Sequence, residues 1–336
     1  MRHFQKFALG SILVVVVYLF VGSFDIWEYR QHHEWRESVS GQQDFLTTAT
    51  IRKWPISESW IIGMIDASRE RVWINVYTLT LPSLRESLVR AQKRGVDVRV
   101  ILEKFPFWNT SINRETEIFF RENNIPLHLS GEKQFAFMHA KYSIIDANWI
   151  VETANWTRAS FSTNREFFIQ GSDTSILNNL ASIFEADFAW GMWLSRDVRL
   201  LAGPTNARER IINFIELSCS KIDIYAPSFS DEKLLAELSR LCLAGKEVRL
   251  LLADYEDSAD SALEKGTCLQ VHHMKKPLHA KVIIRDKESA FVWSFNYTEN
   301  SLENNREVWI FISGEIVKSI SESFESDWKL SEVALR

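Results

Sequence analysis

The sequence predicts an α/β protein with two similar mixed-sheet α/β sandwich halves that form a pseudo-dimer, preceded by one N-terminal transmembrane helix. Three observations lead to this prediction: an apolar run near the N-terminus, a strand-helix-strand pattern that occurs twice, and polar motifs that recur at matching spacing. The 336 residues are enough for about two domains. With 46% apolar and 25% charged residues, the composition excludes disorder over most of the chain.

Residues 1–25 predict a membrane anchor. Phe7 to Phe24 is a stretch of 18 residues without a formal charge, long enough to span the apolar part of a bilayer as a helix. A cleaved signal peptide ending near Val21-Gly22-Ser23 is the alternative, but the run is longer than a usual signal core, which favours the anchor. A slight excess of Lys and Arg before the run predicts a single-pass protein with a cytoplasmic N-terminus and an extracytoplasmic remainder.

The chain after the anchor divides into a linker and two related halves. Residues 26–55 predict a linker, since 38–55 are rich in Ser, Gln and Thr, and the halves are 56–203 and 204–336. Three pairs of segments match between the halves: 71–77 with 221–226, 84–93 with 234–243, and 94–102 with 244–252. In each half they predict a strand, a helix and a second strand, which is typical of a parallel pair with a crossover helix.

Each half also carries the pattern H-x-K-x4-D. Its residues are His139, Lys141 and Asp146 in the first half and His279, Lys281 and Asp286 in the second. On an extended strand His and Lys lie on one face, so that an imidazole and an ammonium group project together, which suits a phosphate. An asparagine and a glutamate follow each histidine at similar distances, namely Asn155 and Glu166, and Asn296 and Glu307.

A structural explanation covers only one copy of this pattern. A histidine on a strand is usually a core residue, and a nearby lysine is usually a solvated edge charge. Two copies in register within a duplication, each followed by the same polar residues, do not follow from packing alone. The repetition therefore predicts a single catalytic site that both halves share.

These motifs resemble those of the phospholipase D superfamily, whose members carry two HKD motifs and two α/β halves that meet at one active site. The resemblance covers about residues 56–330 and implies a site that is complete within one chain. It implies that one motif histidine attacks phosphorus to form a phosphohistidine while the other protonates the leaving alkoxide, with a preference for His139 as nucleophile. It also implies structural roles for Asp146 and Asp286, and neither a metal nor another cofactor.

The chemistry of phosphodiester cleavage fits these residues independently of the resemblance. Displacement at phosphorus needs donors for the equatorial oxygens, which Lys141, Lys281, Asn155 and Asn296 offer. Two histidines serve as nucleophile and as acid and base, because imidazole titrates near neutral pH. Glu166 and Glu307 are expected to hold the far ring nitrogens.

One departure from the family pattern affects the loop before each asparagine. The family usually has Gly-Ser-x-Asn there, whereas this chain has Glu152 and Trp293 in place of the glycines. Thr153 and Ser294 keep the hydroxyl group. Because glycine permits a positive φ or a close backbone approach, its absence indicates either a reshaped entrance to the site or a distant branch of the family.

Three functions remain open for the substrate. A membrane-anchored phosphatidyl hydrolase or transferase is favoured by the apolar N-terminus and by the aromatic cluster Phe105 to Trp108, which either dips into lipid or packs in the core. A nuclease of the same superfamily is disfavoured because 39 basic and 44 acidic residues give a net charge of −5. A non-catalytic scaffold would not need two complete sets of polar residues.

The three cysteines predict no metal site and no disulfide framework. Cys219, Cys242 and Cys268 form no C-x-x-C pair and all lie in the second half. They are expected to be small buried apolar side chains.

Overall fold

The computed structural model describes residues 49–107, 109–131, 135–191, 193, 195, 197–204, 206–254 and 268–333. The predicted anchor, residues 1–25, and most of the predicted linker lie outside these ranges. No helix within the described ranges is both long and apolar enough to cross a bilayer. The single-pass topology and its orientation therefore stay predictions.

The first half contains one sheet of seven strands. Its strands are β1 Thr50–Lys53, β2 Arg71–Val76, β3 Asp97–Glu103, β4 Leu127–Ser130, β5 Tyr142–Ile145, β6 Asn148–Glu152 and β7 Phe167–Gly171. Their order in the sheet is β1-β7-β6-β5-β2-β3-β4, with β2, β3 and β4 parallel and the other pairs antiparallel. Its helices are α2 Ser59–Ala67, α3 Pro82–Lys93, α4 Arg114–Glu122, α5 Arg158–Ser162 and α6 Thr174–Phe188.

The second half repeats this plan with a sheet of eight strands. Its strands are β8 Leu200–Ala202, β9 Lys221–Ala226, β10 Glu247–Ala253, β11 Gln270–Met274, β12 Val282–Arg285, β13 Ser289–Trp293, β14 Val308–Ser313 and β15 Glu332–Val333. Their order is β15-β11-β10-β9-β12-β13-β14-β8, with β9, β10 and β11 parallel. Its helices are α7 Ala207–Glu216, α8 Glu232–Leu243, α10 Glu299–Glu303 and α11 Glu315–Leu330.

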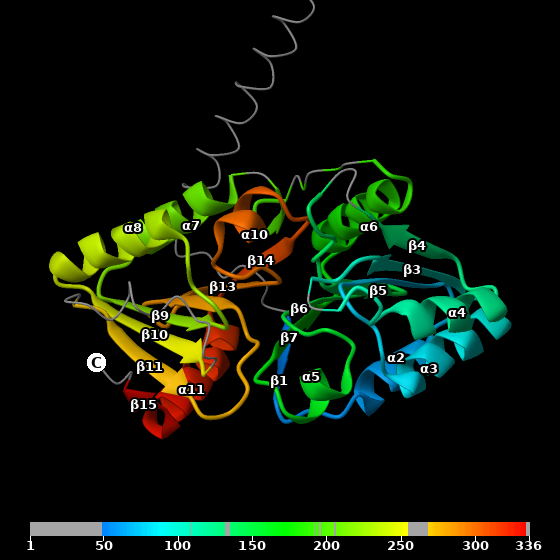
Figure 1. Ribbon diagram of the computed structural model, residues 1–336, viewed down its shortest axis with the longest axis horizontal. Helices are drawn as coiled ribbons and strands as arrows, with labels where there is room; N and C mark the ends of the chain where they lie inside the picture. The colour runs from blue at the N-terminus through cyan, green and yellow to red at the C-terminus, as the bar shows by residue number, and fades with distance from the viewer. Residues whose placement is uncertain are drawn as a thin grey trace, which may run out of the picture. The chain divides into compact units, whose positions relative to one another are not determined.

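The predicted crossover units are present in both halves, and Figure 1 shows the halves side by side, the first from blue to green and the second from green to red. Helices α3 and α8 each connect two neighbouring parallel strands. Each helix is followed by a glycine with positive φ, 91° at Gly95 and 93° at Gly245, which turns the chain into the next strand. The mixed α/β fold in two related halves is therefore confirmed.

Two short strands lie outside the half that the sequence assigned to them. The predicted linker, 26–55, ends in β1, which pairs antiparallel with β7 at the edge of the first sheet. Strand β8 precedes the predicted boundary between residues 203 and 204, but it pairs with β14 of the second sheet. Strands of three or four residues carry too little periodicity to be recognised without their partners.

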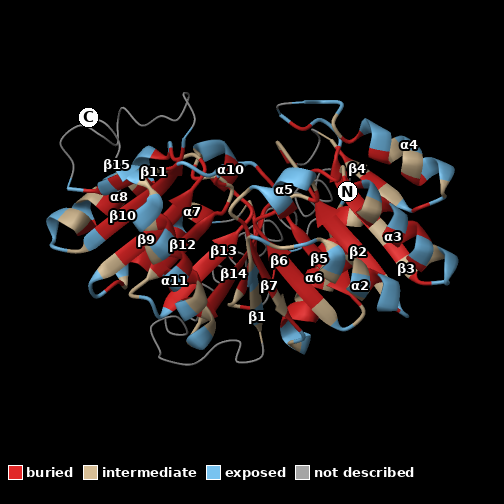
Figure 2. Cartoon of the chain, turned by 90° about the horizontal axis from the view of Figure 1, so that it is seen from below, coloured by how far each residue is buried: buried red, intermediate tan, exposed pale blue. Residues whose placement is uncertain are grey.

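One apolar core joins the two halves. It contains side chains of strands from both sheets, such as Tyr142 and Tyr225, together with residues of α6 and α11. A second core lies within the first half, where α2, α3 and α4 pack on the other face of the sheet. Figure 2 shows the buried residues concentrated in the strands and the exposed ones on the outer helices. The halves therefore fold around a shared interior, which fixes how their loops meet.

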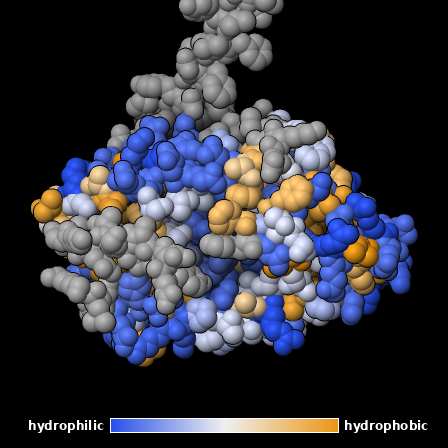
Figure 3. Space-filling model, in the orientation of Figure 1, coloured by the Kyte–Doolittle hydropathy of each residue, from blue (hydrophilic) through white to orange (hydrophobic). Residues whose placement is uncertain are grey.

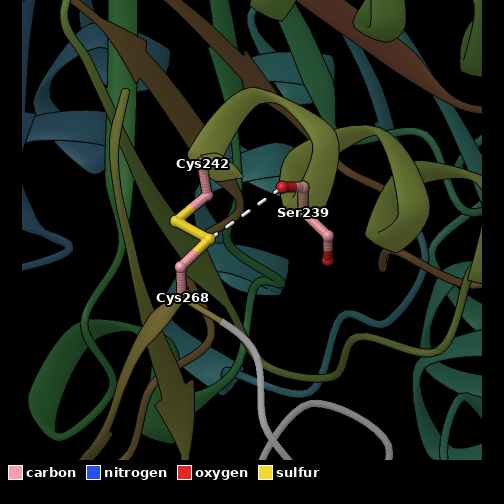
Figure 4. Close-up of a disulfide and its surroundings, with 3 residues drawn as sticks. All are labelled: Ser239, Cys242 and Cys268. Carbon is pink, nitrogen blue, oxygen red and sulfur yellow. Dashed lines mark hydrogen bonds between the residues drawn. A yellow bond between two sulfur atoms is a disulfide. The ribbon is translucent and has the colours of Figure 1, made fainter. Parts of the chain in front are cut away.

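The cysteines differ from the prediction. Cys242, at the end of α8, and Cys268, just before β11, form a disulfide (Figure 4), with their Cα atoms 6.0 Å apart. Cys219 is a free cysteine and is exposed rather than buried. The pairing was not apparent in the sequence because the two cysteines are 26 residues apart and only the parallel arrangement of β10 and β11 brings them together.

Two reciprocal ion pairs tie the halves together. Arg165, in the first half, contacts Asp327 of α11 at 2.6 Å, and Arg306, in the second half, contacts Asp187 of α6 at 2.9 Å. Both side chains of the second pair are 0% exposed. Each arginine directly precedes one of the predicted site glutamates, so the pairs fix the segments that carry these carboxylates.

Replacing Arg306 by alanine is expected to lower the free energy of unfolding by about 3 kcal/mol, because Asp187 then stays buried without its counter-charge. Urea unfolding of the wild type and the variant measures the change. The matched control is Arg240→Ala, which removes a pair with Glu237 whose arginine is 58% exposed, and its unfolding midpoint should equal that of the wild type. Equal midpoints for all three proteins would show that the buried pair contributes nothing.

Candidate active site

The two motif segments lie just before strands β5 and β12, not within them. The histidine end of each segment pairs with the opposite half, whereas the carbonyl oxygens of Lys141 and Lys281 accept from the backbone N–H groups of Glu152 and Trp293 in their own sheets. The backbone N–H of His139 donates to the carbonyl oxygen of Arg306 at 2.9 Å, and that of His279 donates to the carbonyl oxygen of Arg165 at 3.3 Å. Each motif is therefore held by the segment that precedes a glutamate of the other half.

Each motif histidine is paired with the glutamate of the other half. Nδ1 of His139 lies 2.9 Å from Oε1 of Glu307, and Nδ1 of His279 lies 2.7 Å from Oε1 of Glu166. A carboxylate only accepts hydrogen bonds, so Nδ1 carries the proton in both rings and Nε2 keeps a lone pair. The sequence predicted that Glu166 and Glu307 hold the far ring nitrogens, but not that the pairs cross between the halves.

A hydroxyl group of the same half donates a hydrogen bond to the second carboxylate oxygen of each glutamate. Oγ1 of Thr153 donates to Oε2 of Glu166, and Oγ of Ser294 donates to Oε2 of Glu307, both at 2.5 Å. Burial acts to raise the pKa of each glutamate, but the charge and hydrogen bond of the paired histidine, the lysines and the hydroxyl outweigh it and lower the pKa. Both glutamates are therefore buried carboxylates with their oxygens directed at fixed donors.

The motif lysines are fully buried beside the histidines. Nζ of Lys141 donates to the carbonyl oxygen of His139 at 2.9 Å, and Nζ of Lys281 donates to that of His279 at 2.6 Å. Burial lowers the pKa of Lys141 to about 7 and that of Lys281 to about 8, against the opposing charges of the site glutamates. Two ammonium groups and two imidazoles thus lie in one electrostatically coupled cluster.

Burial also lowers the pKa of both histidines. The pKa of His139 falls to about 4, because desolvation outweighs the effect of Glu307, and that of His279 is lowered for the same reason. The His279 side chain is 24% exposed and that of His139 is 12% exposed. Both rings are therefore neutral near pH 7, as a nitrogen nucleophile requires.

The predicted asparagines lie in the loops that follow β6 and β13. The Oδ1 atoms of Asn155 and Asn296 are buried and have no hydrogen-bond partner among the residues that the structure describes. Such atoms are rare in native proteins and often face a ligand or water. The same feature in both halves indicates that each amide is placed for a group that the protein itself does not supply.

The motif aspartates lie at the far ends of β5 and β12 from the histidines. Asp146 accepts hydrogen bonds from the backbone N–H groups of residues 69, 70 and 71 at 2.9–3.1 Å. Asp286 accepts the equivalent bonds from residues 219, 220 and 221 at 2.8–2.9 Å. They connect the end of the motif strand to the start of β2 and β9, and they contact no catalytic candidate in the described residues.

Glu152 and Trp293 replace the family glycines without backbone strain, since neither has a positive φ. Glu152 is buried, accepts a hydrogen bond from Nε1 of Trp156 at 2.9 Å, and burial raises its pKa to about 8. Trp293 is buried and stacks on Phe295 at 4.5 Å. Both side chains point into the interior, so neither residue supports the predicted change at the entrance.

One residue beside the first motif, Tyr77, was not among the predicted site residues. The ring of Tyr77, directly after β2, lies 4.6 Å from the ring of His139 and 5.4 Å from Nζ of Lys141. Burial raises the pKa of Tyr77 to about 12, so its hydroxyl stays protonated. Its position at the carboxyl end of a parallel strand was the available signal. No group of three or more potential metal ligands occurs among the described residues.

Comparisons with known proteins agree with this geometry. Cardiolipin synthase A of Pseudomonas aeruginosa strain LESB58 is 29% identical over 136 residues, which is 39% of this chain and 27% of that protein. The human mitochondrial cardiolipin hydrolase is 28% identical over 130 residues, 37% of this chain and 52% of that protein. The chain thus spans only about a quarter to a half of these relatives.

A solved structure and a family model cover more of the chain. The crystal structure of phosphatidylserine synthase from Haemophilus influenzae Rd KW20 has the same fold, with a TM-score of 0.70 over 90% of this chain and 91% of that one at 10% identity. The family model described as cardiolipin synthase, PLD-like domain, matches residues 61–188 and 211–328, one segment in each half. The chain therefore belongs to this phospholipase D-like family, and each half contains one copy of the domain with its own motif histidine.

Proposed function

We propose that this protein is a phosphodiesterase of the phospholipase D type, which hydrolyses or transfers phosphatidyl groups through a phosphohistidine intermediate. The observation that carries the proposal is the reciprocal pairing of His139 with Glu307 and of His279 with Glu166. This pairing gives two neutral imidazoles with Nε2 lone pairs in one cluster with two buried lysines. A core histidine would not need such an arrangement twice.

In the first step, Nε2 of one histidine attacks phosphorus, a P–N bond forms and the P–O bond to the leaving alcohol breaks. The other histidine, protonated once the anionic substrate is bound, gives its proton to the departing oxygen. In the second step it takes a proton from water or an alcohol, whose oxygen attacks phosphorus as the P–N bond breaks. Lys141, Lys281 and the two asparagine amides stabilise the charge on the equatorial oxygens.

His139 is the nucleophile in this proposal. Its side chain is the less exposed of the two, and burial brings its pKa to about 4, so that the neutral form dominates. His279 is more exposed, which suits a group that must exchange a proton with an incoming water or alcohol. Tyr77 packs against the His139 ring and restricts its orientation.

Phosphatidyl groups are the proposed substrate class. Two relatives carry the names cardiolipin synthase and cardiolipin hydrolase, and these names support a phosphatidyl substrate here. The net charge of −5 gives no general attraction to a nucleic-acid backbone. If the protein cleaves DNA or RNA instead, the same site residues would serve a nuclease, and the proposed substrate class would be wrong.

The full-length protein should form a base-stable and acid-labile covalent phosphoenzyme, as expected for a P–N bond to histidine, from a radiolabelled phosphatidyl lipid in the presence of a metal chelator. His279→Ala should still trap the intermediate, whereas His139→Ala should not. Both variants should lose turnover by more than about a thousandfold. His273→Asn, in the same half but outside the cluster, is the control and should behave as wild type.

The panel of substrates includes phosphatidylglycerol, cardiolipin and single-stranded DNA, all at matched phosphodiester concentration. Trapping from DNA with little from lipid would assign the protein to the nucleases. Full turnover in both alanine variants would rule out the shared histidine site.

The turnover should also decline on the alkaline side of neutrality. Burial lowers the pKa of Lys141 to about 7 and that of Lys281 to about 8, so both charges are present below pH 7 and are lost as the pH rises through these values. We therefore expect kcat/KM for a water-soluble phosphodiester to fall between pH 7 and 9. Thermal unfolding over the same range controls for stability. A constant kcat/KM up to pH 10 would contradict these charged roles.

A further inference from the structure

The loop after β3 presents aromatic side chains to solvent. Phe105 is 40% exposed and Phe107 is 64% exposed, whereas Pro106 between them is buried. Trp108 lies outside the described residues. Figure 3 shows apolar residues gathered near the middle of the face, where the two halves meet. The sequence left open whether this aromatic cluster packs in the core, and the exposure of Phe105 and Phe107 shows that these two side chains do not.

Buried hydrogen bonds hold this loop in place. The carboxylate of Glu103, which is 3% exposed, accepts from the backbone N–H of Phe105 at 2.9 Å and from that of Met138 at 2.7 Å. At the other end, Nδ2 of Asn113 donates to the carbonyl oxygens of Tyr77 and Glu103, both at 2.9 Å. Met138 directly precedes the motif histidine, so one buried carboxylate fixes the loop and the motif segment together.

A continuous aromatic path leads from this loop to His139. The backbone N–H of Phe107 donates to Oη of Tyr77 at 2.6 Å, and the Phe107 ring lies 6.1 Å from that of Phe137. Tyr77 contacts Phe137 at 6.1 Å and His139 at 4.6 Å. The exposed ring and the proposed nucleophile are therefore joined through two intermediate rings.

Among the residues that the structure describes, the second half has no aromatic side chains at the positions that match Tyr77 and Phe137. The positions that match Tyr77 and Phe137 in the repeat are Pro227 and Pro277, and Ala253 stands where the first half has Glu103. The two motif histidines thus differ in their surroundings although their hydrogen bonds are alike. The exposed aromatic surface belongs to the His139 side of the site.

The charge around the loop favours an anionic surface. The charged residues at positions 104–114, Lys104 and Arg114, are both positive and exposed; of the glutamates on either side, Glu103 is buried and Glu115 is paired with Arg85. Exposed aromatic rings flanked by basic residues are typical of segments that lie in the interface of an anionic bilayer. A water-soluble substrate, by contrast, would gain nothing from large aromatic side chains that are exposed to solvent.

We propose that Phe105 and Phe107 insert into the interface of an anionic lipid bilayer and so dock the His139 side of the site on the membrane that holds its substrate. The proposal rests on the proposed function, because it specifies how the same site reaches a phosphatidyl group. The phosphodiester then enters the cluster while its acyl chains stay in the bilayer. Tyr77 and Phe137 line the first part of that path.

The first test compares two physical forms of one substrate with the full-length protein. For Phe105→Ser/Phe107→Ser, we expect kcat/KM on dioleoyl-phosphatidylglycerol vesicles to fall about tenfold, from the loss of apolar area in the bilayer. Turnover of monomeric dihexanoyl-phosphatidylglycerol should stay unchanged. Leu243→Ser is the matched control, because Leu243 is 81% exposed on the second half, and it should leave both activities unchanged.

Equal losses on vesicles and monomers would assign the two rings to the site itself and overturn the docking proposal. Unchanged vesicle turnover would overturn it as well. If the wild type cleaves neither lipid form, the proposed function fails, and the docking surface is then decided by the second test alone.

The second test needs no activity. Phe107→Cys in a Cys219→Ser background, labelled with nitrobenzoxadiazole, should be quenched by doxyl-labelled lipid in phosphatidylglycerol vesicles, and a label at Leu243→Cys should not. An unquenched label at position 107 would overturn the proposal, including the case in which the N-terminal segment or a second copy of the chain covers the loop.

Discussion

The crossed pairing of each motif histidine with a carboxylate of the other half is the interaction on which the site depends. It fixes the tautomer of both rings and brings both imidazoles under the charge of the lysines of both halves. The pairing requires that each motif segment is aligned with the glutamate segment of the other half. The backbone hydrogen bonds from His139 to Arg306 and from His279 to Arg165 hold this alignment. The buried ion pairs of these arginines with α6 and α11 extend the same connection into the shared core.

Burial sets the protonation states of the site residues. Desolvation lowers the pKa of both histidines and both lysines, which keeps the two imidazoles neutral and favours loss of the ammonium protons. An anionic phosphodiester would restore the balance, because its negative charge favours protonated lysines and a protonated acid histidine. The unliganded cluster is therefore suited to a substrate that brings its own charge, and the partnerless Oδ1 atoms of the two asparagines fit the same view.

The sequence predicted the halves and the site residues because both are repeated. Period and register located β2, α3 and β3 and their counterparts, and the recurrence of His, Lys, Asn and Glu marked the site. Crossing between halves could not be predicted, since a glutamate 27 or 28 residues after a histidine is as easily placed beside its own copy. Cys242 and Cys268, the strands β1 and β8, and the role of Tyr77 depend on contacts between segments far apart in the chain, for which a single sequence holds no periodic signal.

The crossed pairs also limit how the duplicated halves can diverge. In the proposed mechanism both halves are required, because each glutamate holds the histidine of the other half and the two histidines have different roles. The halves therefore differ at positions outside these pairs: Pro227 stands where the first half has Tyr77, and Pro277 where it has Phe137. The two histidines of a symmetric duplication thus have different surroundings while their hydrogen bonds stay equivalent.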